Sequence, residues 1–218
     1  MANQFFALED NDICGKTIID VRKKSENCDS ETFEAFIVQT KKVKLEGDGN
    51  INPIASLSGA LPSDSFQLTA LSGGDQDIYC DVTFFTTMIY DRKASPDPFI
   101  DYCYRITSIK GGVISKSDSQ ISVTKLTLGF VEHGEYWING TGGSYMGTLK
   151  NMAKYSKTYP VIGTTYTTSG PSQAYYYCIE DYFSGIQTRT TIYVKRLNSS
   201  FTGKGYVDFV KGTAFGDW

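Results

Sequence analysis

Two runs of alternating apolar and polar residues, within the stretch 76–110, are the strongest structural signal in the chain. In the first run, residues 76–90, the even positions are mostly apolar, and the second run, 99–106, repeats that phase. A period of two indicates a strand with one buried face, because successive side chains point to opposite sides of a sheet. The intervening segment, 91–98, contains two prolines that cannot donate to a ladder. The pattern therefore predicts a long antiparallel hairpin.

Three further segments carry strand patterns. They are Ile13 to Val21, closed by the charged cluster 22–29, then Ala35 to Leu45, and finally Tyr206 to Val210. Ser30 could cap a helix at the start of the second segment, but its β-branched content favours a strand.

The phase of the alternation also predicts irregularities. Gly111-Gly112 predicts a second turn, followed by a short strand over 113–115. Farther on, the apolar positions change from odd to even between Val123 and Leu126. One inserted residue in a ladder produces such a change, so we expect a β-bulge near Thr124-Lys125.

A single helix is predicted near residues 145–156. Tyr145, Leu149, Met152 and Tyr155 recur at three- and four-residue spacing, and Tyr159-Pro160 marks the end. After it, the apolar runs 174–183 and 186–194 flank Ser184-Gly185 and predict a hairpin about a glycine turn.

These elements predict an all-β fold, mainly an antiparallel sandwich or barrel-like sheets, with one short amphipathic helix near residues 145–156. The 15 Tyr, 13 Phe and 21 Gly suit strands and tight turns. We expect residues 1–218 to form a single β domain, and interpret the Gly/Pro/Asn-rich segment 46–64 as an extended loop or assembly arm.

Charge and cysteine content narrow the cellular setting. A formal net charge of −3 gives no overall attraction to nucleic acid or anionic membrane. No run approaches the ~18 apolar residues of a spanning helix, and the start of the sequence lacks signal-peptide features, so we expect a chain made and kept inside a cell. Its five cysteines, Cys14, Cys28, Cys80, Cys103 and Cys178, are predicted to be reduced; the alternatives are a Cys14–Cys28 disulfide or a bridge between subunits.

His133 is the only histidine, so a Ser-His-Asp or Cys-His arrangement would have to use it. It stands between Glu132 and Glu135, just before a predicted turn, and no Gly-x-Ser-x-Gly motif occurs. We interpret it as a surface turn histidine. One histidine and no Cys-x-x-Cys pair also argue against a structural zinc site.

Paired carboxylates would be needed for glycoside hydrolysis. Glu180 follows the aromatic run Tyr175 to Tyr177, and Asp101 or Glu135 could supply a second acid. Aromatic residues beside acids are typical of sugar sites and equally of any tyrosine-rich sheet surface.

Two weaker signals have simpler interpretations. The segment 46–52 alternates oxygen ligands with glycine but departs from the EF-hand pattern, so an acidic glycine turn is the better interpretation. The basic clusters 22–24 and 41–44 are typical of charges that protect a sheet edge, while a phosphate contact is only weakly indicated.

No catalytic, cofactor-binding or metal-binding residue is therefore assigned, and no cofactor is expected. We predict a non-enzymatic structural subunit that self-assembles into a larger symmetric complex, with a virion component such as a bacteriophage tail-tube, tail/neck or capsid protein as the favoured case. Its partners would be copies of itself in a ring, tube or shell, other virion proteins and, passively, nucleic acid, with no membrane. It would be made in the host cytoplasm and located in the virion. The alternatives are a carbohydrate-binding β-sandwich, such as a lectin or receptor-binding module, and a polysaccharide-active enzyme.

Overall fold

The protein is built from antiparallel β-strands. The computed structural model describes residues 18–46, 78–138, 143–179, 183–197 and 201–214. Its strands are β1 (Ile18–Glu26), β2 (Glu31–Glu46), β3 (Ile78–Ala94), β4 (Tyr102–Lys116), β5 (Ile121–Ile138), β6 (Ser144–Thr158), β7 (Tyr166–Ser169), β8 (Tyr175–Tyr177), β9 (Gly185–Arg196) and β10 (Thr202–Gly212). No helix occurs in the described ranges, and therefore none that could cross a bilayer.

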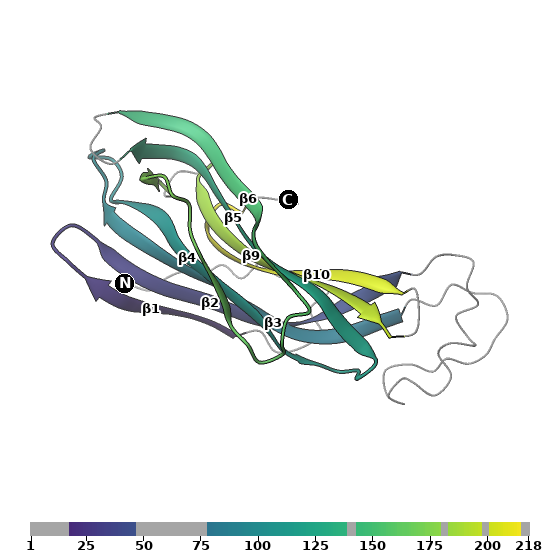
Figure 1. Ribbon diagram of the computed structural model, residues 1–218. Helices are drawn as coiled ribbons and strands as arrows, with labels where there is room; N and C mark the ends of the chain where they lie inside the picture. The colour runs from purple at the N-terminus through teal and green to yellow at the C-terminus, as the bar shows by residue number, and fades with distance from the viewer. Residues whose placement is uncertain (1–17, 47–77, 139–142, 180–182, 198–200, 215–218) are drawn as a thin grey trace.

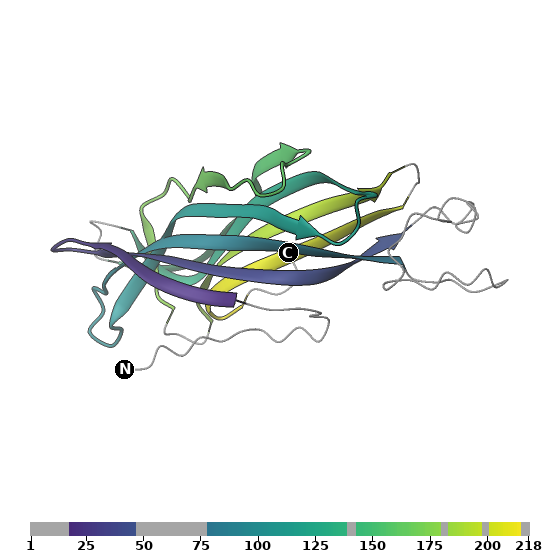
Figure 2. The same cartoon turned by 90° about the horizontal axis from the view of Figure 1, so that it is seen from below.

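Seven of these strands form an antiparallel barrel. Hydrogen bonding follows the order β2-β10-β9-β5-β8-β4-β3, and the pairing of β3 with β2 closes the ring. The remaining strands are attached to it: β1 pairs with β2, β6 with β5, and β7 with β4. In Figure 1 the green β6 follows β5 along the upper side of the barrel. Figure 2 shows the purple β1 along the edge of β2.

The ring is held unevenly around its circumference. β2 and β3 pair from Glu31 to Leu45, whereas β10 and β2 share only two register positions. The contact between β8 and β4 is narrower still, since Tyr104 and Tyr177 are its single registered pair. These two short pairings are the narrowest hydrogen-bonded contacts in the ring.

The core lies inside the ring and is supplied by alternate residues of each strand. On β3, Val82, Phe84 and Met88 are completely buried, as are Ile186 and Ile192 on β9. Both faces of β9 are covered, because the residues between these apolar positions are buried as well. Burial of apolar surface at about 25 cal/mol per Å² supplies the main stabilisation of such a barrel.

Several predictions from the sequence are confirmed. The hairpin within 76–110 corresponds to β3 and β4, which pair in antiparallel register. Strands also form over the predicted segments 35–45 and 206–210, each extended at both ends. The bulge near Thr124 is present, since the register between β5 and β9 shifts between Val123 and Lys125.

The predicted turn at Gly111-Gly112 is wrong. Both glycines lie inside β4, opposite Thr86 and Phe85 of β3. A side chain on Gly111 would collide with the Thr190 hydroxyl inside the barrel. The glycines therefore permit a close approach of neighbouring segments, which is the other common reason for glycine in a strand.

The predicted helix near 145–156 is also wrong, because this segment is strand β6. Tyr145, Leu149 and Tyr155 face the same side of the strand, where Leu149 and Tyr155 pack against the core. A spacing of four residues satisfies a period of two as well as a helical period. The segment is a strand because it pairs with β5 on both sides of a bulge, from Ser144 to Thr158.

The predicted hairpin about Ser184-Gly185 does not form. β8 pairs with β4 and β5, whereas β9 pairs with β5 and β10. At the N-terminal end, the predicted strand 13–21 is described from Ile18 and continues through the charged cluster to Glu26. Residues 13–17 and 47–64, the latter most of the predicted arm, lie outside the described residues.

Candidate assembly surface

One edge of β6 is left unpaired by the described strands. This strand pairs with β5 from Lys125 to Trp137 and with no other strand of the described ranges. Its second edge therefore presents backbone N–H and C=O groups that the described strands leave available. Such a row is a template on which a further strand can pair.

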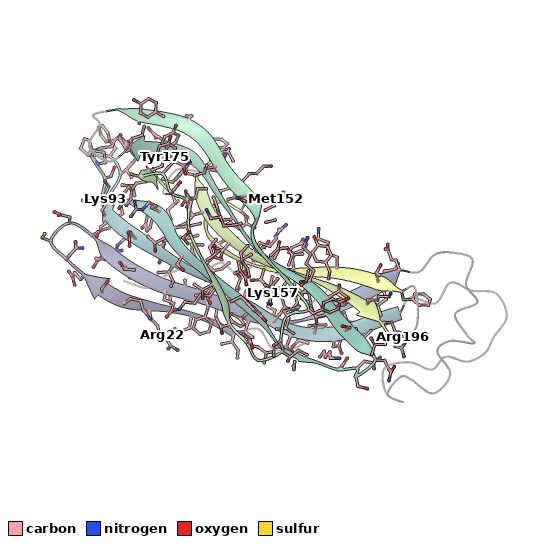
Figure 3. All side chains as sticks on the ribbon, in the orientation of Figure 1. Arg22, Lys93, Met152, Lys157, Tyr175 and Arg196 are labelled. Atoms are coloured by element: carbon pink, nitrogen blue, oxygen red, sulfur yellow. The ribbon has the colours of Figure 1, made fainter. Side chains whose placement is uncertain are left out.

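The two halves of this edge differ in shape. Residues 144–151 follow β5 in unbroken register, but at Gly129 the register shifts, and Met152, Ala153 and Lys154 together stand opposite that one glycine. An added Cβ on Gly129 would lie 2.7 Å from the carbonyl oxygen of Met152. The close approach of β6 at this bulge therefore depends on glycine. Figure 3 labels Met152 and Lys157 in the bulged half.

The two halves also differ in charge. Lys154 and Lys157 lie in the bulged half, which combines two devices that keep edges from pairing, an irregular backbone and lysine side chains. The regular half contains one charged residue, Lys150, and the residues before it, Ser144 to Leu149, carry no charge. We call residues 144–149 the uncharged edge.

Large apolar side chains are exposed on and after this edge. Met146 is 64% exposed and Tyr145 47% exposed. Of the twelve large apolar residues that are exposed in the described ranges, six fall between residues 145 and 162: Tyr145, Met146, Met152, Tyr159, Val161 and Ile162. Apolar exposure is therefore concentrated on β6 and the segment that follows it.

A stack of tyrosines holds the uncharged edge in place. The ring of Tyr145 stacks on Tyr136 of β5 with centroids 5.7 Å apart, and Tyr136 stacks in turn on Tyr175 of β8 at 4.6 Å. Three positions along, His133 Nδ1 and the Thr148 hydroxyl are 2.7 Å apart. These contacts hold the edge within the single chain, without a partner.

His133 does not occupy the predicted turn. It lies within β5, where Gly134 follows in a left-handed conformation with φ of 110°. Glu132 does not hydrogen-bond His133, because the Glu132 carboxylate points into the barrel and accepts the backbone N–H of Ile106 at 2.7 Å. Complete burial raises the pKa of Glu132 to about 8, opposed by that hydrogen bond and by Arg105.

Of the three tyrosines of the predicted sugar-binding platform, Tyr175 is partly buried and the other two are buried. Tyr177 is 1% exposed and belongs to the core, and Tyr176 is 6% exposed. The Nζ of Lys93 lies 4.0 Å from the ring centroid of Tyr176, and the guanidinium carbon of Arg105 lies 4.8 Å from it. Lys93 and Tyr175 can be located at the same end of the barrel in Figure 3, far from Arg196.

The proposed pair of catalytic acids is not assembled by the described residues. Glu180 lies outside them, Asp101 is an exposed residue just before β4, and Glu135 belongs to β5, where its N–H donates to the Ser184 hydroxyl at 3.1 Å. Of the segment 46–52, interpreted as an acidic glycine turn, only Glu46 lies within the described residues. Among the described residues, no group of three or more His, Cys, Asp or Glu is placed to hold a metal ion.

The basic cluster of β1 has acidic partners, and in that of β2 one lysine contacts an aromatic ring. In β1, Lys23 contacts Glu26 and Glu31 at 2.5 and 2.6 Å, and Lys24 contacts Glu34 at 3.1 Å. In β2, Lys41 lies over the ring of Tyr206. The β1 pairs fit the predicted role of an edge strand protected by charge.

Comparisons with protein families, with curated proteins and with solved structures found no match for this chain. The uncharged edge was missed from the sequence because a helix was predicted there. The signal that could have revealed it is the uncharged run from Ser144 to Leu149, between the glycines before it and the lysines after it.

Proposed function

We propose that the chain is a non-enzymatic structural subunit that assembles with copies of itself into a larger symmetric complex. The observation that carries the proposal is the uncharged edge of β6, which is regular, is held by the tyrosine stack and includes the exposed residues Tyr145 and Met146. A virion component, such as a bacteriophage tail-tube, tail/neck or capsid protein, is the case that fits an all-β subunit of this kind.

The occupant of the edge is a second copy of the same strand. In an antiparallel pair of uncharged edges, related by a two-fold axis that passes between the two copies of Met146, no charged side chain lies opposite another. Two other strands, β1 and β7, also pair with a single strand each; β1 is a poorer partner because it carries Asp20, Arg22 and Lys23, and β7 because it is only four residues long. Main-chain hydrogen bonds would provide the affinity and the flanking side chains the register. A two-fold contact of this type is one of those from which a shell or a stacked tube is built.

Native mass tests the proposal. Purified protein would be analysed by light scattering over a range of concentrations, with negative-stain images of the same fractions. We expect dimers at the least, and rings, tubes or shells in the images. A monomer at every concentration would contradict self-assembly. The burial of Tyr176 and Tyr177 gives no support to the sugar-binding alternative, which a glycan-array experiment would test in that event.

A further inference from the structure

Two buried cysteines lie next to the narrow pairing of β4 with β8. These strands are antiparallel, with Tyr104 in register with Tyr177. Continued by one residue, this register places Cys103 opposite Cys178, and both residues are 0% exposed. No disulfide is formed in the structure among Cys28, Cys80, Cys103 and Cys178.

The backbone hydrogen bonds indicate which kind of cross-strand position this is. The N–H of Cys178 donates to the carbonyl oxygen of Glu135 on β5, at 2.8 Å, so the polar backbone of Cys178 points away from β4. Cys103 and Cys178 therefore occupy a non-hydrogen-bonded position, at which Cα atoms in a regular antiparallel ladder are about 4.5 Å apart. Disulfides span Cα separations of about 4.4 to 6.8 Å.

The two side chains also lie on the same face of the sheet. Tyr104 and Tyr177 point into the core, and because side chains alternate along a strand, Cys103 and Cys178 point to the opposite face. Burial raises the pKa of the Cys103 thiol to about 11, with a smaller contribution in the same direction from Cys178. The electrostatic influence of one thiol on the other agrees with their proximity, and the raised pKa predicts slow oxidation at neutral pH.

We propose that Cys103 and Cys178 are a disulfide site, and that the bond fastens β8 to β4 when the protein meets a low-molecular-weight disulfide such as oxidised glutathione. The thiolate of one cysteine attacks the oxidant and releases one small thiolate, leaving a mixed disulfide. The second cysteine then displaces the other small thiolate. Two protein S–H bonds and one small-molecule S–S bond become one protein S–S bond and two small thiols, which take up both protons.

The position gives this bond a structural consequence. β8 is tied to β4 by one registered pair, so the covalent link would replace the narrowest non-covalent closure of the ring. It would close a loop of about 75 residues, and in the chain-entropy account such a bond stabilises the fold by restricting the unfolded state. This inference is independent of the proposed function, because it concerns the barrel of a single chain.

The test is oxidation of the purified chain, without substitution, by excess oxidised glutathione. Protease mapping without reductant should recover a peptide joining Cys103 to Cys178, and the intact mass should fall by two hydrogens. The unfolding temperature should rise by roughly 10 °C and return on reduction. Cys103→Ala should abolish both changes, while Cys80→Ala, which removes another buried thiol, should retain them.

Two results would overturn the proposal. One is an oxidised product in which the only bonds are to Cys28 or between chains. The other is a protein that keeps both thiols after the global fold has been loosened by mild denaturant in the presence of oxidant. Both results are measured on the unsubstituted protein, so the test remains valid even if the Cys103→Ala variant does not fold.

Discussion

The carboxylate of Glu132 accepts the backbone N–H of Ile106 at 2.7 Å, and this bond joins β5 to β4 inside the barrel. The second carboxylate oxygen, Oε2, is buried and has no hydrogen-bond partner in the structure. A buried, half-satisfied carboxyl group is most stable in its neutral form, because the charged form loses its hydration.

The first prediction follows from the raised pKa of Glu132. Its carboxyl has a pKa of about 8 in the folded chain against 4.5 for the ordinary group. Above the ordinary pKa the unfolded chain releases this proton while the folded chain keeps it, so the contribution of Glu132 to stability is complete below about pH 4.5 and falls as the pH rises to about 8. The loss amounts to ~5 kcal/mol at most, at about 1.4 kcal/mol per pH unit.

Glu132→Gln tests this prediction, because glutamine keeps an oxygen that can accept the Ile106 N–H but cannot ionise. Urea unfolding at pH 5 and at pH 8 should show the variant gaining on the wild type by several kcal/mol between the two values. Glu135→Gln, on the same strand, should leave the wild-type profile unchanged. Parallel profiles for wild type and Glu132→Gln would show that Glu132 does not titrate in this range.

The second prediction concerns the ion pair between Arg189 and Asp208. Arg189 Nε donates to Oδ1 and Nη2 donates to Oδ2, both at 2.6 Å, and Gln187 donates to Oδ2 at 2.9 Å. The two charged side chains are only 8% and 13% exposed, and the guanidinium carbon lies 3.9 Å from the ring centroid of Tyr206. Two parallel bonds in a largely dry setting are stronger than a surface pair.

Asp208→Asn should therefore lower the free energy of unfolding by about 2 kcal/mol, since charged hydrogen bonds in such a setting are replaced by weaker ones. The matched control is Asp20→Asn, which removes the acid of the Arg22–Asp20 pair, whose side chains are 65% and 41% exposed. That change should stay within about 0.5 kcal/mol. Equal effects of the two substitutions in urea unfolding would contradict the assigned difference in burial.

The third prediction distinguishes a strand glycine from a turn glycine. On Gly111, an added Cβ would collide with the Thr190 hydroxyl and lie 2.5 Å from Leu128 Cδ2, across the barrel interior. Gly111→Ala should destabilise the fold by about 1 to 3 kcal/mol through overpacking. Gly143→Ala is the control, because its nearest neighbour would be the Tyr145 hydroxyl at 3.6 Å. Circular dichroism melts of both variants would measure the difference.

How far the sequence could predict this fold depends on which interactions set each pattern. In β3 the alternation of Val82, Phe84 and Met88 with polar residues reflects one buried face, so the strand could be predicted locally. The bulge at Thr124 was predictable for the same reason: one extra residue changes the phase of the buried positions. Both features are written in consecutive residues.

The errors arise where the deciding partner is distant in sequence. Leu149 and Tyr155 are partly buried because β5 lies beside them, and the bulge around Met152 adds the residues that gave the spacing its helical appearance. Gly111 was assigned to a turn because nothing nearby in sequence shows that Thr190 approaches it from β9. The candidate surface went undetected for the same reason, since an open edge is defined by the absence of pairing on one side, a property that only the assembled sheet has.

The last prediction tests the uncharged edge itself. Met146 is 64% exposed and stands opposite Glu135 in register on β5, so Met146→Lys should leave the monomer folded with a favourable cross-strand neighbour. At a contact between two uncharged edges the same change places a charge from each copy close to the two-fold axis. We expect the dissociation constant of the contact to rise at least about tenfold, which corresponds to 1.4 kcal/mol.

Phe99→Lys is the matched control, because Phe99 is 94% exposed in the β3–β4 connection and its substitution adds the same charge elsewhere. Light scattering at several concentrations should show that Phe99→Lys assembles as the wild type does while Met146→Lys shifts toward monomer. Circular dichroism spectra should be the same for all three proteins. If both variants assemble normally, the contact between copies lies elsewhere on the barrel; if both are impaired to the same degree, added positive charge and not the edge of β6 accounts for the loss.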